Sequence, residues 1–188
     1  VDKEVVELIK RAIWISSETE GAFDITVGGL VKLWGFKDET YHVPLKDSIF
    51  MVMNNIGYSN IEVADDSTII KKKNSQLDLS GIAKGYAVDM AYLVLKNVGI
   101  KSFLINAGGE IRSMGEDWTT GVQDPFSDQG IVEVLLPGDK AVATSGNYQN
   151  YFEVGKTRYC HLFDPKTGFP ADKVVSVTVI SDDVTTAD

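Results

Sequence analysis

Residues 77–89 read LDLSGIAKGYAVD and mark the place where the chain is predicted to pass from a strand into a long helix. The strand is expected to end at Asp78, and the helix to cover residues 82–98 with Gly99 as its C-terminal cap. The helix is indicated by small and apolar residues at helical spacing: Ala83, Ala87, Met90, Ala91, Val94 and Leu95.

The start of this helix has two interpretations. Unpaired N–H groups at a helix start, together with the charge of Lys84, suit the binding of an anion. An ordinary capped helix explains the same residues, with Ser80 as N-cap and Asp78 interacting favourably with the helix dipole.

The rest of the chain predicts a mixed α+β fold. A helix is expected at residues 1–16 and another near residues 45–55, and residues 61–79 resemble a hairpin with a turn at Asp65 and Asp66. The segment SFLINAGGEIRSMG, residues 102–115, predicts an apolar strand broken by Gly108 and Gly109. The last third contains short predicted strands joined by turn residues, and VVSVTVI at residues 174–180 predicts a buried strand. Helices and strands come in blocks, without regular βαβ alternation, so we expect one α+β domain over residues 1–188 with mainly antiparallel sheet.

Composition narrows the functional classes. The 188 residues carry a net charge of −9, so a nucleic-acid partner is not expected, because such binding needs a cationic surface. The single cysteine, Cys160, excludes an internal disulfide and a thiolate zinc cluster, and there are only two histidines. Any metal site should therefore use oxygen ligands, and no apolar run is long enough to span a membrane.

Two glycine-containing motifs lie in the predicted strand region. NAGGE, residues 106–110, allows another group to approach the backbone closely, although a bulge or bend explains its glycines equally well. ATSGNY, residues 143–148, suits a phosphate cradle or a turn. Ser145 as a nucleophile is the alternative, but the flanking GxSxG pattern is missing.

Two further motifs combine turn residues with chemically active side chains. In HLFDPKTGFP, residues 161–170, His161 beside Asp164 is a candidate general base, although both side chains also suit a purely structural turn. In the terminal TTAD, Asp188 and the two preceding threonines offer hard oxygen ligands for Mg²⁺, with a helix cap as the ordinary alternative.

Taken in order, six segments resemble the successive motifs of the ApbE family, the FAD:protein FMN transferases. They are GAFDITVGGLVKLWGF, LDLSGIAKGYAVD, INAGGEIRSMG, AVATSGNYQNYF, HLFDPKTGFP and VVSVTVISDDVTTAD. The resemblance covers the chain from about Gly21 onward. It implies an ApbE or T-fold-like domain, and a reaction in which FAD is split, FMN is joined to a threonine or serine of a partner protein, and AMP leaves.

The resemblance also implies roles for individual residues. FAD would be bound by Ala22, Phe23, Asp24, Asp78, Lys84 and Leu162. Mg²⁺ would be held by the main-chain carbonyl of Gly81, where the family more often has alanine, and by Asp188. His161 is the candidate for activating the attacking hydroxyl, with Asp164 and Lys84 as alternatives.

Several expectations follow from the resemblance alone. The chain is expected to lack an N-terminal segment, with further FAD contacts and a lipoprotein signal, and a C-terminal end that supplies another metal ligand. Location would be the periplasm or the extracytoplasmic face of the bacterial inner membrane, attached only through that N-terminal lipid anchor. The acceptor would be a subunit of a redox complex. Alternatives are an FAD pyrophosphatase giving FMN and AMP, a non-catalytic FAD-binding protein, and a structural domain without ligand.

Overall fold

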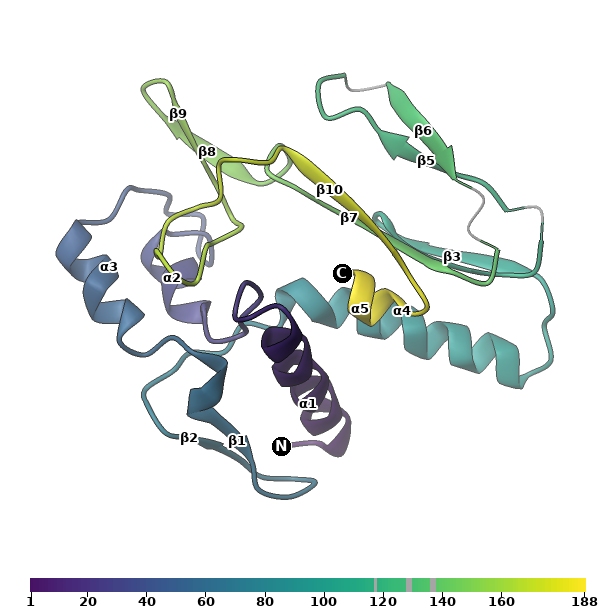
Figure 1. Cartoon of the computed structure of the whole chain (residues 1–188), viewed down its shortest axis with the longest axis horizontal. Coiled ribbons are helices and arrows are strands. Elements are labelled where there is room, and N and C mark those ends of the chain that lie inside the picture. The colour runs from purple at the N-terminus through teal and green to yellow at the C-terminus, as the bar shows by residue number, and fades with distance from the viewer. Residues whose placement is uncertain (117, 128–129, 136–137) are drawn as a thin grey trace. The chain divides into compact units, whose positions relative to one another are not determined.

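The computed structural model describes residues 1–116, 118–127, 130–135 and 138–188 (Figure 1). The helices are α1 (Lys3–Glu18), α2 (Gly28–Leu33), α3 (Lys46–Met53), the 3₁₀ turn η1 (Tyr58–Asn60), α4 (Ser80–Asn97) and α5 (Val184–Ala187). The strands are β1 (Ile61–Val63), β2 (Ile69–Lys71), β3 (Phe103–Ala107), β4 (Glu110–Met114), β5 (Thr120–Gln123), β6 (Ile131–Leu135), β7 (Ala141–Gly146), β8 (Tyr151–Val154), β9 (Thr157–Cys160) and β10 (Ser176–Ser181).

The chain divides into two units, each made of two segments. Unit 1 contains residues 1–79 and 149–173, and unit 2 contains residues 80–148 and 174–188. The expectation of a single domain over residues 1–188 stays a prediction, and each unit is described by itself below.

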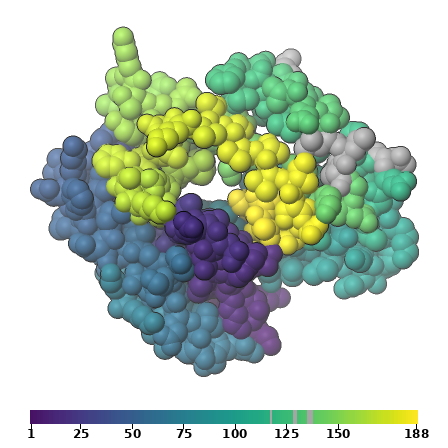
Figure 2. Space-filling view, in the orientation of Figure 1, coloured from purple at the N-terminus to yellow at the C-terminus, as the bar shows by residue number. Residues whose placement is uncertain are grey.

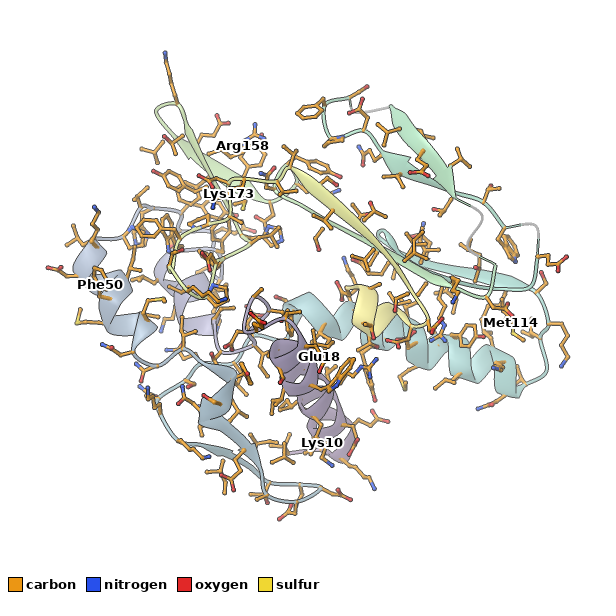
Figure 3. All side chains as sticks on the ribbon, in the orientation of Figure 1. Lys10, Glu18, Phe50, Met114, Arg158 and Lys173 are labelled. Carbon is orange, nitrogen blue, oxygen red and sulfur yellow. The ribbon has the colours of Figure 1, made fainter. Side chains whose placement is uncertain are left out.

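Unit 1 is built on α1 and on an aromatic core. The apolar face of α1 is buried at Val6, Leu8, Ile9 and Ala12, which explains why this amphipathic sequence forms a helix. The β1–β2 hairpin is antiparallel. Trp34, fully buried after α2, packs against Phe152 and Tyr159 of the β8–β9 hairpin. On the surface, Phe50 of α3 and Arg158 of β9 are both exposed (Figure 3).

Unit 2 is an antiparallel sheet packed against two helices. The strand order is β10-β7-β4-β3, and α4 and α5 lie along one face of this sheet (Figure 1). The core between the layers consists of Val88, Ala141, Ala143, Val184 and Ala187. The long helix and the short C-terminal helix are therefore held to the same face of the same sheet.

Most predicted elements are confirmed. The helices expected near the start, at residues 45–55 and at residues 82–98 are present, and the named strands pair only antiparallel within the described residues. Gly99 has a φ of +87° just beyond α4, as its predicted capping role requires.

The predicted strand ending at Asp78 is wrong. Gln76 makes one isolated parallel bridge with Val27, and the N–H of Asp78 donates to the carbonyl of Ile25 at 2.8 Å. The neighbouring segment turns into α2 at Gly28, so no extended partner remains for a continuing ladder.

Two further expectations need correction. The segment SFLINAGGEIRSMG is not one interrupted strand but the hairpin β3–β4, with Gly108 and Gly109 in its turn at φ +70° and +111°. Residues 176–180 of the VVSVTVI segment lie in β10, but this strand is not buried, since Val177 is 49% exposed and Ile180 is 53% exposed. β10 is an edge strand, and helices cover only one face of its sheet. Its apolar side chains are therefore more exposed than the sequence predicts.

Candidate functional site

Asp188 lies against α4 in unit 2. Its Oδ2 accepts a hydrogen bond from the N–H of Gly85 at 2.8 Å, which joins residues 103 positions apart. A side chain at Gly85 would prevent this, because a Cβ there would lie 2.6 Å from the carbonyl oxygen of Val184 and 2.8 Å from the Cβ of Asp188. The C-terminal turn and the first turns of α4 are therefore in direct contact.

Gly81 interrupts the helix one turn earlier. Its φ of −84° and ψ of 16° are not helical. In a regular helix the N–H of Gly85 would donate to the carbonyl of Gly81, whereas here it donates to Asp188. The Asp188 carboxylate therefore lies one helical turn from the Gly81 kink, next to the other predicted metal ligand.

Lys84 is paired with a buried carboxylate that the sequence analysis did not assign. Its Nζ lies 2.7 Å from Oε2 of Glu110, the first residue of β4, and the Glu110 side chain is only 5% exposed. The Lys84 side chain is 50% exposed, so its ammonium group remains accessible. The pair places a fixed cation on the same helix as Gly81.

The environment disfavours an uncompensated charge on Asp188. Burial raises the pKa of its carboxyl group, and the negative charge of Glu110 raises it further, while the Gly85 hydrogen bond and Lys84 act in the opposite direction. Within the described ranges, no cluster of three or more histidine, cysteine, aspartate or glutamate side chains could hold a metal. The available donors are hard oxygens, main-chain and carboxylate, which fit Mg²⁺.

The hydroxyl groups of Thr185 and Thr186 form hydrogen bonds within unit 2. The buried Thr185 hydroxyl donates to Asp89 at 2.5 Å, and the Thr186 hydroxyl donates to Asp183 at 2.6 Å. Of the oxygen-bearing residues in TTAD, Asp188 is the best placed to serve as a ligand.

In unit 1, Asp24 organises the loop that follows α1. Its Oδ1 accepts from the N–H and hydroxyl of Thr26 at 2.8 and 2.6 Å, and its Oδ2 accepts from the N–H of Tyr58 at 2.7 Å. The carboxylate is buried, Ala22 is exposed and Phe23 is half-buried. Asp24 therefore fixes the loop that presents Ala22 and Phe23.

His161 has a defined ring orientation. Its Nδ1 lies 3.1 Å from the main-chain oxygen of Asn150. A carbonyl oxygen only accepts, so Nδ1 carries the hydrogen and donates, and in the neutral ring Nε2 holds the lone pair. The neighbouring Leu162 is half-buried, and its carbonyl accepts from the N–H of Ala171 at 2.7 Å.

The Asp164 side chain stabilises the turn in which it lies. Its carboxylate accepts from the N–H of Lys166 at 2.8 Å and from the hydroxyl of Thr167 at 3.0 Å. The structural interpretation of Asp164 is thus supported, and Asp164 is a weaker candidate for a base than His161. Ser145 lies on the regular strand β7, opposite Val177, which is not the geometry of a nucleophile elbow.

The predicted residues fall into both units. Unit 1 holds Ala22, Phe23, Asp24, Asp78, His161 and Leu162, and unit 2 holds Gly81, Lys84 and Asp188. Unit 1 also has an open pocket of about 380 Å³, lined in part by Thr26, Ser48, Asn55 and Gln76, but none of the predicted residues lines it. Sequence reasoning missed Gly85 and Glu110, although both stand inside motifs that it had selected.

Fold and site together define an α+β protein in which the side-chain carboxylate of Asp188 is bound at the kinked start of a long helix. The model of the ApbE family matches residues 1–188, and the chain belongs to that family. This confirms the resemblance that the six motifs indicated.

Individual relatives agree with this assignment. An FAD:protein FMN transferase of Vibrio cholerae is 38% identical, with 100% of this chain and 59% of the relative aligned. One of Rhodobacter capsulatus is 34% identical, covering 97% of this chain and 36% of the relative. The crystal structure of an ApbE protein from Thermotoga maritima superimposes with a TM-score of 0.94 at 41% identity, covering 100% of this chain and 63% of that one.

These coverages also give the extent of the match. The chain spans 59% of the Vibrio cholerae relative and 36% of the Rhodobacter capsulatus relative. No helix in the described part of the chain is long and apolar enough to cross a membrane.

Proposed function

We propose that the complete protein is a Mg²⁺-dependent FAD:protein FMN transferase. It would join FMN from FAD to a threonine or serine hydroxyl of a partner protein, a subunit of a redox complex, and release AMP. Family membership and the names of the relatives support the reaction. The observation that carries the metal-dependent step is the 2.8 Å hydrogen bond between Gly85 and Asp188.

The metal would be held by oxygens from two neighbouring segments of unit 2. Asp188 offers the carboxylate oxygens, and Gly81, at the kink of α4, offers its carbonyl. A bound cation would offset the burial that raises the pKa of Asp188. When bound, Mg²⁺ supplies charge neutralisation at the diphosphate of FAD.

Lys84 would bind the same anionic part of the substrate. Its ammonium group is accessible, and Glu110 holds it in place at 2.7 Å. The ion pair with the buried Glu110 side chain limits the rotamers of Lys84. Lys84 is thus placed to donate hydrogen bonds to a phosphate group.

His161 would act as the general base. The bond of Nδ1 to the carbonyl of Asn150 leaves Nε2 to accept the proton of the attacking hydroxyl. Asp164 is committed to its turn, so it competes less well for this role. The flavin dinucleotide would further contact Ala22, Phe23, Asp24, Asp78 and Leu162, with Asp24 acting by fixing its loop.

One experiment separates the transferase from its alternatives. The complete protein is incubated with FAD, Mg²⁺ and an acceptor that carries a threonine site, and the products are analysed by mass spectrometry. Covalent FMN on the acceptor, with AMP in equal amount, is expected. Free FMN without labelled acceptor would indicate the pyrophosphatase, and bound but intact FAD would indicate a binding protein.

For the location we propose the extracytoplasmic side of the bacterial inner membrane. The single cysteine, Cys160, is compatible with an oxidising compartment, where unpaired exposed thiols are a liability, because it is buried. This location is tested by fusing the complete protein to a phosphatase that is active only outside the cytoplasm. Phosphatase activity is expected, whereas activity of a fused reporter that works only inside the cytoplasm would contradict the proposed location.

A further inference from the structure

The helix that carries Asp188 is attached to α4 at a second point, one turn beyond Gly85. The two carboxylate oxygens of Asp89 accept from the N–H groups of Val184 and Thr185, at 3.0 and 2.8 Å. The Thr185 hydroxyl adds a bond of 2.5 Å. Asp89 thereby satisfies the first N–H groups of α5, which have no partners inside that short helix.

Asp89 is itself buried and held in place. Its side chain is 7% exposed and forms an ion pair with Arg112 of β4. The guanidinium of Arg112 lies 3.8 Å from the ring centre of Tyr92, which belongs to the same helix as Asp89. Helix α4, strand β4 and helix α5 are thus joined through one carboxylate.

The spacing along α4 links this carboxylate to Asp188. Gly85, Asp89 and Tyr92 follow one another at four and three residues, so they share one face of the helix. Gly85 binds the last residue of the C-terminal turn, and Asp89 binds its first two N–H groups. The turn is therefore fastened to α4 at both ends.

We propose that Asp89, supported by Arg112, is the positioning residue for the metal ligand Asp188. It fixes the start of α5, so that the Asp188 carboxylate, which follows this helix, stays bound to Gly85 in the first turns of α4. The inference rests on the proposed metal site, since Asp89 acts on the cation only through Asp188. A hydrogen-bonded residue behind a metal ligand commonly sets both the orientation and the affinity of that ligand.

Asparagine cannot replace Asp89. An amide offers one acceptor oxygen, whereas the site presents two N–H groups, a hydroxyl and a guanidinium, all of them donors. In Asp89→Asn the amide NH₂ would face donors, and the start of α5 would lose at least one bond.

The test measures Mn²⁺ binding to the complete protein by electron paramagnetic resonance, because Mn²⁺ takes the same oxygen ligands as Mg²⁺. Asp89→Asn is expected to weaken Mn²⁺ binding by about 10- to 100-fold, as for other residues that orient metal ligands. Thr185→Val should weaken it less, and Thr185→Ser, which keeps the hydroxyl, should leave it unchanged.

A matched control separates positioning from general stability. Val6→Ala removes a fully buried side chain in unit 1, so it should lower the melting temperature without changing the Mn²⁺ affinity. Unchanged Mn²⁺ affinity in folded Asp89→Asn would overturn the inference. If that variant fails to fold, equal affinities in Thr185→Val and Thr185→Ser would overturn it instead.

The same experiment also tests the proposed metal site on which the inference rests. Should Asp188→Ala bind Mn²⁺ as tightly as the unaltered protein, the metal site itself is misplaced, and the role of Asp89 falls with it. Loss of binding in Asp188→Ala but not in Asp89→Asn would remove the positioning role alone.

Discussion

At the scale of single residues, the absence of a side chain at Gly85 matters as much as the carboxylate of Asp188. The carbonyl of Val184 and the Cβ of Asp188 occupy the space that a Cβ on Gly85 would take. A glycine inside a helix costs about 1 kcal/mol relative to alanine, so the position gives up helix stability for this close approach.

Gly85→Ala is therefore expected to destabilise the protein, although alanine normally favours helices. Displacing α5 should lower the free energy of unfolding by about 1–3 kcal/mol, measured by urea denaturation. Ala91→Gly, at an exposed position of the same helix, should cost about 1 kcal/mol and leave Mn²⁺ affinity intact. A stabilised Gly85→Ala would contradict the close packing.

His161→Ala tests the general base directly. We expect the transfer rate to fall by about 100- to 10,000-fold, the usual contribution of a positioned base, with FAD binding unchanged. Added imidazole should restore part of the rate, because it supplies the missing proton acceptor. Loss of FAD binding without rescue would instead assign His161 to the substrate pocket.

Cys160 predicts a pH dependence of stability. Burial raises the pKa of its thiol above the value in the unfolded chain, so the unfolded state ionises first as pH rises. The stability contribution is complete below about pH 8.5, the unfolded thiol pKa, and declines at higher pH. Urea denaturation of the unaltered protein and of Cys160→Ala from pH 7 to pH 10 should show this decline only in the former.

At the scale of elements, α2 and the β8–β9 hairpin depend on one aromatic core. The ring of Trp34 lies 5.4 Å from that of Tyr159 and 5.8 Å from that of Phe169, and its indole N–H donates to the carbonyl of Gly168 at 3.2 Å. This core connects the segment after α1 to the HLFDPKTGFP turn, which are far apart in sequence but belong to the same unit.

Two tryptophan substitutions should differ accordingly. Trp34→Ala is expected to reduce the free energy of unfolding by about 3–5 kcal/mol, because it leaves a cavity and an unpaired carbonyl. Trp14→Ala, on the exposed side of α1 under Arg11, should cost about 1 kcal/mol or less. Chemical denaturation monitored by circular dichroism compares them, and equal losses would contradict the assigned core.

At the scale of the whole molecule, the negative net charge requires that the site attract an anionic substrate locally. With a net charge of −9, the protein repels an anionic dinucleotide at long range, so local cations must provide the attraction. Part of the yellow C-terminal segment is visible at the molecular surface in Figure 2, and Gly81 and Lys84 are exposed.

FAD should therefore stabilise the complete protein in a Mg²⁺-dependent manner. At FAD concentrations of about 100 times its Kd, binding to the folded state alone raises the free energy of unfolding by about 2.7 kcal/mol. We expect this shift to shrink when Mg²⁺ is chelated and in Asp188→Ala. A thermal melt shows it, and a shift of equal size without Mg²⁺ would separate FAD binding from the metal.

The sequence by itself determined the local elements and the family. Periodicity located α1, α3 and α4, turn residues located the β1–β2 hairpin, and six ordered motifs indicated the ApbE family, which the family model confirms. These features depend on residues close together in the chain, so their signals can be read from spacing alone. The roles of Asp188, Gly81 and His161 came from resemblance and stay predictions.

Only the tertiary structure decided which partners these residues have. No spacing rule connects Gly85 with Asp188, Asp89 with Thr185, or Lys84 with Glu110, because each pair forms only after the sheet and helices have packed. The same holds for the predicted strand at Asp78, which lacks an extended neighbour, and for β10, whose apolar residues lie at a sheet edge. Hydrogen-bond partners and burial are set by long-range packing, which local composition does not encode.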